Sequence, residues 1–369
     1  MTTHHGLRRL ARTLLLLLCV SLLGACGGEQ PTDTDDAQLD PRAFRIAWSI
    51  YVGWMPWGYA AEAGIVDRWA ERYGIEIDVV QVNDYIESIN QYTAGAFDGC
   101  VMTNMDALTI PAAGGVDSTA LIVGDFSNGN DGLVMRGQKA LSDIAGMDVN
   151  LVALSVSHYL LARALDTVGL TEREVNVVNT ADADIVGAFA AGGVEAAVAW
   201  NPQLSAILEQ PQATLAFDSS RIPGEIIDLL VVNTDVLAAN PALGKALVGA
   251  WYETMALMAQ DSEAGAEARA AMAQAAGTTL ASYERQLEAT RMFHEPAEAA
   301  AFARSAVLPE TMDRVRRFSF EHGLLGPGAD SPDAIGIAFP NGQVLGSEAN
   351  IKLRFDSDYM AAAAASEAP

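Results

Sequence analysis

The chain has 369 residues, of which 50% are hydrophobic, and its formal net charge is −25 at pH 7. This acidic balance excludes nucleic acid as a partner, because binding to phosphate groups requires clustered Lys and Arg. The length suits two domains of ordinary size, and so many acids indicate a well-solvated surface rather than a particular ligand.

Residues 1–26 predict a cleaved export signal. Three arginines precede the apolar run at 14–20, and the segment 22–26 (Leu-Leu-Gly-Ala-Cys) resembles the lipobox of bacterial lipoproteins. The apolar run is short for a helix that spans a bilayer, although an ordinary N-terminal anchor is the alternative. The resemblance implies that lipid is attached to Cys26, so we expect an exported protein anchored to the cell-envelope membrane, on its periplasmic or extracellular face.

Residues 27–42 are polar and lack apolar periodicity, which predicts a flexible tether. Beyond it, no run reaches the roughly 18 apolar residues of a spanning helix, so the lipid would be the membrane contact. With Cys19 removed in the signal and Cys26 lipidated, Cys100 stands alone and no internal disulfide is expected.

From residue 44 onward, short β-rich runs alternate with helical stretches. A first series of strands is expected at 44–49, 75–81, 97–103, 119–125 and 132–135, and a second at 148–152, 175–179, 196–200 and 214–217. Such alternation predicts βαβ units, and therefore an α/β protein with two parallel-rich sheets.

One more strand is expected at 228–233, after which the chain is Ala-rich and helical to about residue 323. Because this tail has no sheet of its own to cover, we expect it to pack on the first lobe. The predicted domains are therefore a discontinuous lobe I (43–132 and 229–360), an inserted lobe II (133–228) and a disordered tail (361–369). Two strands that cross between the lobes would form a hinge.

Five segments occur in the order found in one family of transport proteins. They are 95–104 (Gly-Ala-Phe-Asp-Gly-Cys-Val-Met-Thr-Asn), 133–136, 141–146, 155–161 and 190–202. Together they resemble the substrate-binding proteins of ABC importers, in the nitrate/sulfonate/taurine and thiamine-precursor group. The resemblance implies a type II periplasmic-binding-protein fold, with two lobes joined by two hinge strands.

Three further segments, at 48–57, 124–132 and 222–228, resemble a subfamily of urea-carboxylase-associated transporters that is linked to guanidine uptake. This resemblance implies a small guanidinium-like or urea-like ligand, delivered to ABC permease and ATPase subunits. A taurine, sulfonate or nitrate receptor, a thiamine-precursor receptor and a lipoprotein sensor are the alternatives.

Ligands of open α/β sheets bind beyond the carboxyl ends of the strands, so the loops at those ends supply the candidate site. The candidate ligand-binding residues are Trp48, Tyr51, Trp54, Trp57, Asp84, Asn104, Asp106, Asp125, Ser155, Ser157, Trp200 and Asp228. None of these loops offers Arg or Lys, whereas a sulfonate or nitrate would need cationic side chains or many aligned N–H donors. Carboxylates and aromatic faces suit a cation such as guanidinium instead.

Several candidates have a second interpretation. The aromatic cluster at 48–57 could be core, and Asp84 and Asp106 could be N-caps of the helices that follow. Ser155 and Ser157 open a helix whose N–H groups would suit an anion, although capping explains them equally well. Asp228 lies in an apolar strand, so we expect a cationic partner, either the ligand or a structural arginine such as Arg136.

No catalytic residue, metal site or cofactor is predicted. The chain lacks a Gly-x-Ser-x-Gly elbow, a phosphate loop, His-Glu-x-x-His, a paired Cys-x-x-Cys and a dinucleotide fingerprint. A calcium loop at 125–136 is rejected, because Gly129 occupies a ligand position and Arg136 replaces the final Glu. An enzyme of pyrimidine biosynthesis shares the fold that the resemblance implies, but the export signal argues against that class.

Overall fold

The computed structural model describes residues 43–366. The expected signal, tether and lipidation site at Cys26 therefore lie outside the described residues. Among the helices that the structure describes, none has the length and apolar character needed to cross a bilayer.

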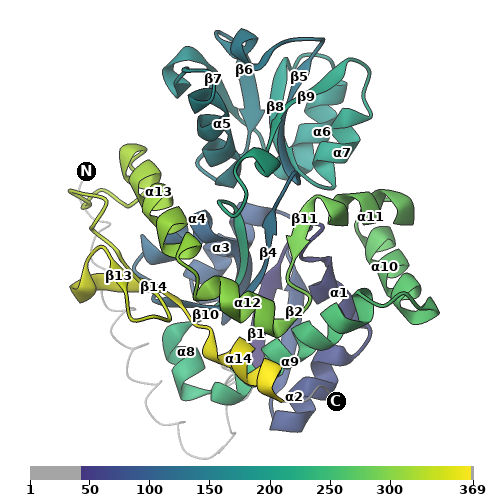
Figure 1. Cartoon of the computed structure of the whole chain (residues 1–369), viewed down its shortest axis with the longest axis vertical. Helices are drawn as coiled ribbons and strands as arrows, with labels where there is room; N and C mark the ends of the chain where they lie inside the picture. The colour runs from purple at the N-terminus through teal and green to yellow at the C-terminus, as the bar shows by residue number, and fades with distance from the viewer. Residues whose placement is uncertain (1–42, 367–369) are drawn as a thin grey trace, which may run out of the picture. The chain divides into compact units, whose positions relative to one another are not determined.

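Two sheets organise the described chain (Figure 1). Sheet A has the order β13-β12-β14-β4-β10-β3-β1-β2, with β11 paired to β4, and sheet B has the order β7-β6-β8-β5-β9. The strands of sheet A are β1 (Ala43–Trp48), β2 (Glu76–Gln81), β3 (Gly99–Thr103), β4 (Ser118–Ser127), β10 (Ile227–Asn233), β11 (Thr290–Met292), β12 (Gly336–Ala338), β13 (Val344–Leu345) and β14 (Ile351–Phe355). Those of sheet B are β5 (Asp131–Arg136), β6 (Asp148–Leu151), β7 (Asn176–Asn179), β8 (Ala196–Trp200) and β9 (Ala213–Asp218).

Each sheet combines parallel and antiparallel pairs. β1 runs parallel to β2 and β3, and β6 runs parallel to β7 and β8, as the alternating pattern predicts. The antiparallel pairs include those of β10 with β3 and β4, and those of β5 with β8 and β9. β5 and β10 are the strands that the chain enters after crossing from one sheet to the other.

Every strand expected up to Asn233 is present, with ends within two residues of the prediction. The tail differs from the expectation, because β11 and β14 both pair with β4 and so extend sheet A. β11, β12 and β13 have only two or three residues each, which is too few to show an alternating pattern.

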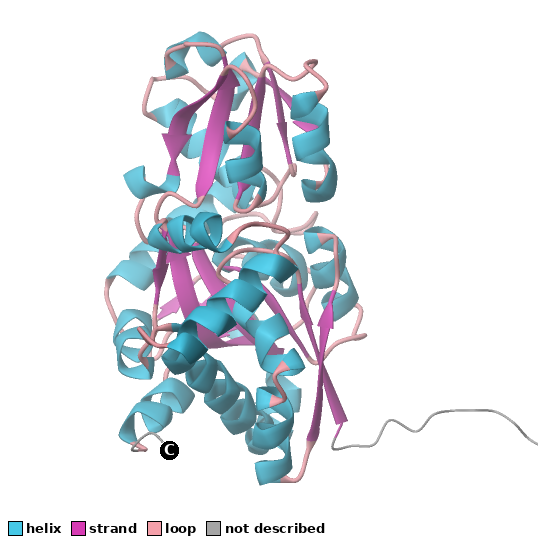
Figure 2. Ribbon diagram, turned by 90° about the vertical axis from the view of Figure 1, so that its right-hand side faces the viewer, coloured by secondary structure: helices cyan, strands magenta, loops and turns pink. Residues whose placement is uncertain are grey.

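Helices flank both sheets, as Figure 2 shows in cyan. Lobe I, which is the part built on sheet A, has α1 (Met55–Glu62), α2 (Ile65–Tyr73), α3 (Tyr85–Thr93), α4 (Asn104–Ala107), α8 (Thr234–Ala239), α9 (Pro241–Met258), α10 (Glu263–Ala275), α11 (Leu280–Glu288), α12 (Pro296–Ala303), α13 (Val307–Glu321) and α14 (Asp358–Ala365). Lobe II, built on sheet B, has α5 (Val156–Asp166), α6 (Asp182–Ala190) and α7 (Gln203–Leu208). Residues 361–365 thus continue α14 instead of belonging to a disordered tail, and 367–369 lie outside the described residues.

Helix α9 shows how sequence spacing builds the core. Pro241 occupies its first turn, where the missing N–H costs no hydrogen bond. Leu247, Trp251 and Met255 recur every fourth residue and are all buried, so they form one stripe along the helix. The Trp251 ring stacks on Trp57 of α1, with 5.0 Å between the ring centroids.

The chain passes between the sheets twice, at 128–130 and at 219–226. The Ser127 and Ser219 hydroxyls are hydrogen-bonded at 2.6 Å, and the Gly129 N–H donates to the Ser219 hydroxyl at 2.8 Å. The two crossing segments therefore lie side by side, which is the arrangement of a two-stranded hinge.

Candidate ligand-binding site

A small cavity lies where the carboxyl ends of β3 and β8 face each other. Its lining consists of Tyr51, Trp54, Tyr85, Thr103, Asp131, Val156, Trp200, Ile226 and Asp228. Lobe I and lobe II both contribute residues, so a ligand held there would touch both lobes. The enclosed space is far smaller than the roughly 300–1,000 Å³ of pockets for drug-sized ligands, so only a ligand of very few atoms suits it.

Aromatic rings form one wall of the cavity. Tyr51 and Trp54 meet edge to face at 5.0 Å between centroids, Trp54 and Tyr85 are 5.5 Å apart, and Tyr85 and Trp200 are 5.6 Å apart. Tyr51 and Trp54 lie in the turn between β1 and α1, where the Val52 N–H donates to the Asn201 carbonyl of lobe II at 3.3 Å. The rings therefore run continuously from one lobe to the other.

Sheet register brings two of the carboxylates together. Asp228 of β10 is the cross-strand partner of Asp125 on β4 and of Thr103 on β3. The Asp125 Oδ1 accepts a hydrogen bond from the Tyr51 hydroxyl at 3.2 Å, and both carboxyl groups are fully buried. Burial raises the pKa of Asp125 to about 7, and burial together with the nearby charge of Asp125 raises the pKa of Asp228 well above the usual range.

Two more buried aspartates complete the acidic side of the site. Burial raises the pKa of Asp131, which lines the cavity, to about 7, and that of Asp106 to about 6. Asp106 lies behind the lining, where its Oδ2 accepts hydrogen bonds from the Tyr85 hydroxyl at 2.6 Å and the Thr103 hydroxyl at 2.9 Å. Within residues 43–366, no Arg or Lys is among the groups that change the pKa values of these four aspartates.

Several buried polar atoms around the cavity have no hydrogen-bond partner within the described chain. The acceptors are Asp106 Oδ1 and Asp125 Oδ2, and the donors are the indole N–H groups of Trp54 and Trp200. Unpaired buried polar groups are costly, so these atoms are available to a ligand or to ordered water. His and Cys are absent from the described lining, so the site offers oxygen and aromatic groups and not the soft ligands of a transition metal.

The structure places the predicted residues in three groups. Tyr51, Trp54, Trp200 and Asp228 line the cavity, and Asp106 and Asp125 lie directly behind tyrosines of that lining. The other six do not line it, and they are Trp48, Trp57, Asp84, Asn104, Ser155 and Ser157.

Among the predicted residues that do not line the cavity, Trp48, Trp57 and Asp84 have structural roles. Trp57 packs on Trp251, and Trp48 is buried against Gly58. Asp84 is exposed and caps α3, where it accepts from the Glu87 N–H at 2.9 Å. Buried aromatic residues in a short turn and an Asp at a helix N-cap are both common structural features. From the sequence alone they cannot be distinguished from residues of a binding site.

The polar candidates Asn104 and Ser155 bind main-chain groups instead. Asn104 accepts from the Ile227 N–H at 3.1 Å and donates to the Glu225 carbonyl at 3.2 Å, so it holds the end of β3 to the second crossing segment. Ser155 caps α5 through the Ser157 N–H at 3.2 Å. The Ser157 hydroxyl is buried without a described partner.

Of the two partners considered for Asp228, the alternative that Arg136 neutralises it is wrong. The guanidinium of Arg136 donates to the carbonyls of Val194 and Phe189 and lies over the Phe189 ring at 4.3 Å. Arg136 lies at the end of β5 that is farther from the cavity. The residue pattern of a single strand does not show which of its two ends lies near the site.

Tyr85, Thr103 and Asp131 line the cavity but are missing from the predicted set. Tyr85 directly follows the predicted Asp84, and Thr103 ends the predicted strand 97–103. Asp131 begins β5 within the segment 124–132, so proximity to other candidates is the signal that could have identified all three.

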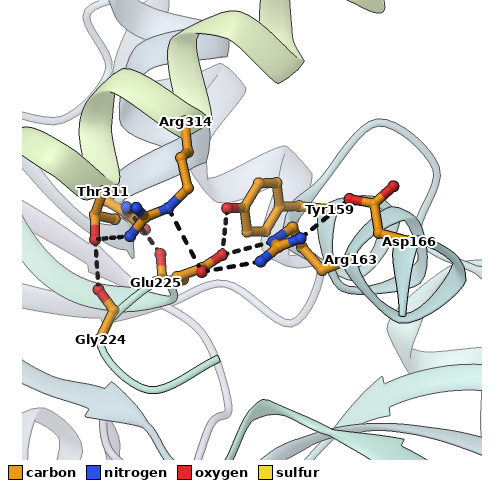
Figure 3. Close-up of polar contacts among 8 residues, drawn as sticks. Tyr159, Arg163, Asp166, Gly224, Glu225, Thr311 and Arg314 are labelled. Atoms are coloured by element: carbon orange, nitrogen blue, oxygen red, sulfur yellow. Dashed lines mark hydrogen bonds and ion pairs between the residues drawn. The ribbon is translucent and has the colours of Figure 1, made fainter. Parts of the chain in front are cut away.

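A second set of contacts joins the lobes beside the cavity (Figure 3). The buried carboxylate of Glu225, in the second crossing segment, accepts from the Tyr159 hydroxyl at 2.6 Å and from Arg163 Nε at 2.9 Å, both on α5. Arg314 Nε of α13 lies 3.5 Å from the same carboxylate. Burial alone would raise the pKa of Glu225, but the Arg163 and Tyr159 hydrogen bonds hold it below its usual value.

The fold and the cavity between the lobes define a protein of the periplasmic-binding-protein fold. The chain belongs to the NMT1-like family, whose model matches residues 47–277. A Brucella abortus protein, whose name assigns it a binding role provisionally, is 24% identical over 192 residues, which is 51% of this chain and 58% of that protein. The alignment thus spans a little over half the length of this relative.

Solved structures with the same fold include three solute-binding proteins. The alkanesulfonate-binding protein SsuA of Xanthomonas axonopodis, bound to MOPS, has a TM-score of 0.63 and 18% identity, covering 78% of this chain and 95% of SsuA. The aliphatic sulphonate-binding SsuA of Escherichia coli has a TM-score of 0.62 and 20% identity, covering 79% and 96%. The nitrate-binding protein NrtA of Synechocystis PCC 6803 has a TM-score of 0.55 and 12% identity, covering 88% and 98%.

Proposed function

We propose that this protein is the solute-binding component of an ABC importer and that its ligand is a small cation of the guanidinium type. The observation that carries the proposal is the composition of the cavity: Asp131 and Asp228 line it beside aromatic rings, and no Arg, Lys or His is present in the described lining. Binding alone, without catalysis, is the activity proposed.

The chemistry of guanidinium matches these groups. Its planar N–H donors bind carboxylates in a bidentate manner, which suits Asp131 and Asp228 on opposite lobes. The faces of Trp54 and Trp200 would attract its charge, a contribution of about 0.5–2 kcal/mol depending on desolvation. The cation would also relieve the repulsion between carboxylates that are otherwise buried together.

Transport follows from the position of the ligand between the lobes. A ligand that contacts both lobes favours the closed form over the open form, because only the closed form makes both sets of contacts. In the proposed cycle the closed protein docks on a permease, whose ATPase subunits drive release. The proposal includes a lipid at Cys26 as the anchor that keeps the protein at the membrane.

A urea-like or sulfonate ligand is the second candidate, and the unpartnered indole N–H groups of Trp54 and Trp200 favour it. These donors suit an acceptor oxygen, which urea, taurine and alkanesulfonates have and guanidinium lacks. SsuA of Xanthomonas, with the same fold, is an alkanesulfonate-binding protein. A sulfonate in this cavity would lie against Asp131 and Asp228, however, and would require both to be protonated.

Thermal unfolding with a panel of ligands tests the proposal. The described residues 43–366 belong to one compact unit, so a protein of residues 41–369 is suitable. We expect low-millimolar guanidinium, but not taurine or nitrate at equal ionic strength, to raise the melting temperature. At one hundred times Kd the stabilisation is about 2.7 kcal/mol.

Two variants separate the site from general salt effects. Asp131→Asn should abolish the stabilisation by guanidinium, whereas Asp84→Asn keeps both the exposure and the helix cap and should leave it intact. Stabilisation by taurine or nitrate alone would contradict the cation proposal and support the second candidate.

A further inference from the structure

Three ionisable side chains meet outside the cavity, where α13 of lobe I faces lobe II. His322 follows the last turn of α13, Glu172 lies in the short helix η3 (Glu172–Glu174), and His158 lies in the first turn of α5. One oxygen of Glu172 contacts His322 Nε2, and the other contacts His158 Nε2. Glu172 and His322 are 150 positions apart, so no local motif in the sequence indicates this group.

The three side chains offer the ligand atoms of a metal site. One ligand atom from each of His158, Glu172 and His322 lies within 4.8 Å of the other two. Two imidazole nitrogens and a carboxylate oxygen are a ligand set that binds Zn²⁺, with metal–ligand distances of about 2.0–2.2 Å. The ligand atoms of a tetrahedral ion at those distances are about 3.3–3.6 Å apart. Small movements of these side chains therefore let one ion contact all three.

The second ring nitrogen of His322 orients the ring for a metal. Its Nδ1 lies 2.8 Å from the Phe318 carbonyl oxygen, which can only accept a hydrogen bond. A neutral ring therefore carries its hydrogen on Nδ1, and the Nε2 lone pair faces the Glu172 carboxylate. A lone pair and a carboxylate that face each other need a positive charge between them. Metal-binding histidines commonly donate from their other nitrogen to a backbone carbonyl in this way.

Glu172 has one oxygen that hydrogen bonds do not explain. Its Oε1 is buried and accepts no hydrogen bond within the described chain, although His158 Nε2 lies against it. A hydrogen bond requires an acceptor close to the N–H direction, with a preferred angle above about 150°. Two ligands of one tetrahedral ion are instead about 109° apart at the metal. A shared ion therefore suits an oxygen that lies away from the N–H direction.

Binding by His158 requires one rearrangement. Its Nδ1 accepts from the Leu154 N–H at 3.1 Å, so a neutral ring carries its hydrogen on Nε2. For Nε2 to bind a metal, that hydrogen moves to Nδ1 and the bond from Leu154 is lost. Leu154 lies in an exposed turn before α5, so this loss costs less than it would in the core. His322 and Glu172 are thus the preformed ligands, and His158 is the third.

We propose that His158, Glu172 and His322 bind one Zn²⁺ ion that joins the two lobes. His158 and Glu172 belong to lobe II and His322 belongs to lobe I, so the ion has all three ligands only when the lobes are together. Zn²⁺ therefore favours that arrangement over a separated one. Three protein ligands leave the fourth position of a tetrahedral ion to water.

The metal site is separate from the proposed ligand site. None of its three residues belongs to the described lining of the cavity. Zn²⁺ binding needs no guanidinium, and guanidinium binding needs no Zn²⁺. A failure of either proposal can therefore be recognised separately.

Calorimetric titration with ZnCl₂ tests the proposal. The protein of residues 41–369 is purified without a histidine tag and stripped with EDTA, which is then removed. Its histidines are His158, His294 and His322. Its one cysteine, Cys100, is buried and so does not compete for the metal. We expect one Zn²⁺ to bind per chain, and about a hundredfold excess of Mg²⁺, which prefers oxygen ligands, not to displace it.

Matched variants assign the ion to the three residues. His322→Gln, Glu172→Gln and His158→Gln should each weaken Zn²⁺ binding by more than about tenfold, the least that loss of a supporting group costs a metal site. His294→Gln replaces a half-buried histidine elsewhere in lobe I and should keep the full affinity. Thermal unfolding in EDTA checks that each variant is folded, and added Zn²⁺ should raise the melting temperature of the parent and of His294→Gln only.

Two results would overturn the proposal. If the parent protein binds no Zn²⁺, the three side chains form only ion pairs. If folded His322→Gln binds Zn²⁺ as tightly as the parent, the ion does not join the lobes at this site.

Discussion

Asp228 and Asp125 are cross-strand partners on β10 and β4, so sheet A holds two buried carboxyl groups side by side. Like charges in such a position cannot both ionise at low cost, and burial adds to the penalty. Without a ligand, the pair is therefore expected to keep a proton. A cation in the cavity would replace that proton, which connects the β10–β4 register to the proposed ligand.

Replacing Asp228 should separate stability from binding. Asp228→Asn removes a carboxyl group that is costly to ionise, so the ligand-free protein should be at least as stable as the parent at pH 8. Binding of guanidinium should weaken about tenfold or more, since a hydrogen bond to a charged group contributes about 1.5–3 kcal/mol. Thermal unfolding and calorimetric titration measure the two effects, and unchanged affinity would remove Asp228 from the site.

The stability of the ligand-free protein should depend on pH through Asp131. Burial raises its pKa to about 7 from an ordinary value near 4, so the folded state holds more protons than the unfolded state between these values. Stability should therefore fall as the pH rises from about 4 to 7, by up to about 1.4 kcal/mol per pH unit for this group. Thermal unfolding of Asp131→Asn should show a flatter pH profile than the parent.

The affinity for guanidinium should rise over the same pH range, because the cation binds the deprotonated carboxylates. Calorimetric titration between pH 5.5 and 7.5 measures this change. A ligand that binds more tightly at pH 5.5 than at pH 7.5 would have to be an anion or a neutral molecule.

The two tryptophans of the cavity distinguish the candidate ligands. Trp54→Phe retains an aromatic face but lacks the indole N–H, so guanidinium affinity should fall only about threefold, in line with a weaker cation–π contact. An acceptor ligand such as urea or taurine would lose a buried hydrogen bond and bind about tenfold more weakly. Trp57→Phe, a core substitution, should lower the melting temperature without changing ligand affinity.

Glu225 should stabilise the closed arrangement of the lobes through Arg163 and Tyr159. Because its pKa is held below the usual value, its contribution is present at neutral pH and is lost as the pH falls below about 4. Glu225→Gln should lower the unfolding free energy at pH 7 by about 2 kcal/mol, the scale of a charge-assisted hydrogen bond. Glu284→Gln, in a half-exposed pair with Arg269, should cost less than about 1 kcal/mol.

The sequence predicted the strands better than the side-chain contacts. Apolar runs bounded by turns located each strand up to Asn233, because burial on both faces leaves a strong local signal. The C-terminal strands β12 and β13 have three and two residues and are too short to leave one. The loops at strand ends correctly indicated Tyr51, Trp54, Trp200 and Asp228. The sequence does not distinguish a ring buried in the core from a ring that lines a cavity, as Trp57 and Trp54 show.

The contacts that the sequence could not predict depend on how distant segments of the chain pair and pack. The pairing of Asp228 with Asp125, 103 positions apart in number, depends on the crossing of the chain between two sheets. The same crossing directs Arg136 away from Asp228. The contact of His322 with Glu172 likewise depends on how α13 meets lobe II, so it has no counterpart in local periodicity.

A crystal structure of residues 41–369 grown with guanidinium chloride, and with taurine in a parallel experiment, tests the central claim most directly. The account predicts a planar ligand between Trp54 and Trp200, with nitrogen atoms about 2.7–2.9 Å from carboxylate oxygens of Asp131 and Asp228. A cavity that excludes guanidinium but holds taurine, with its sulfonate near the indole N–H groups and the start of α5, would contradict it.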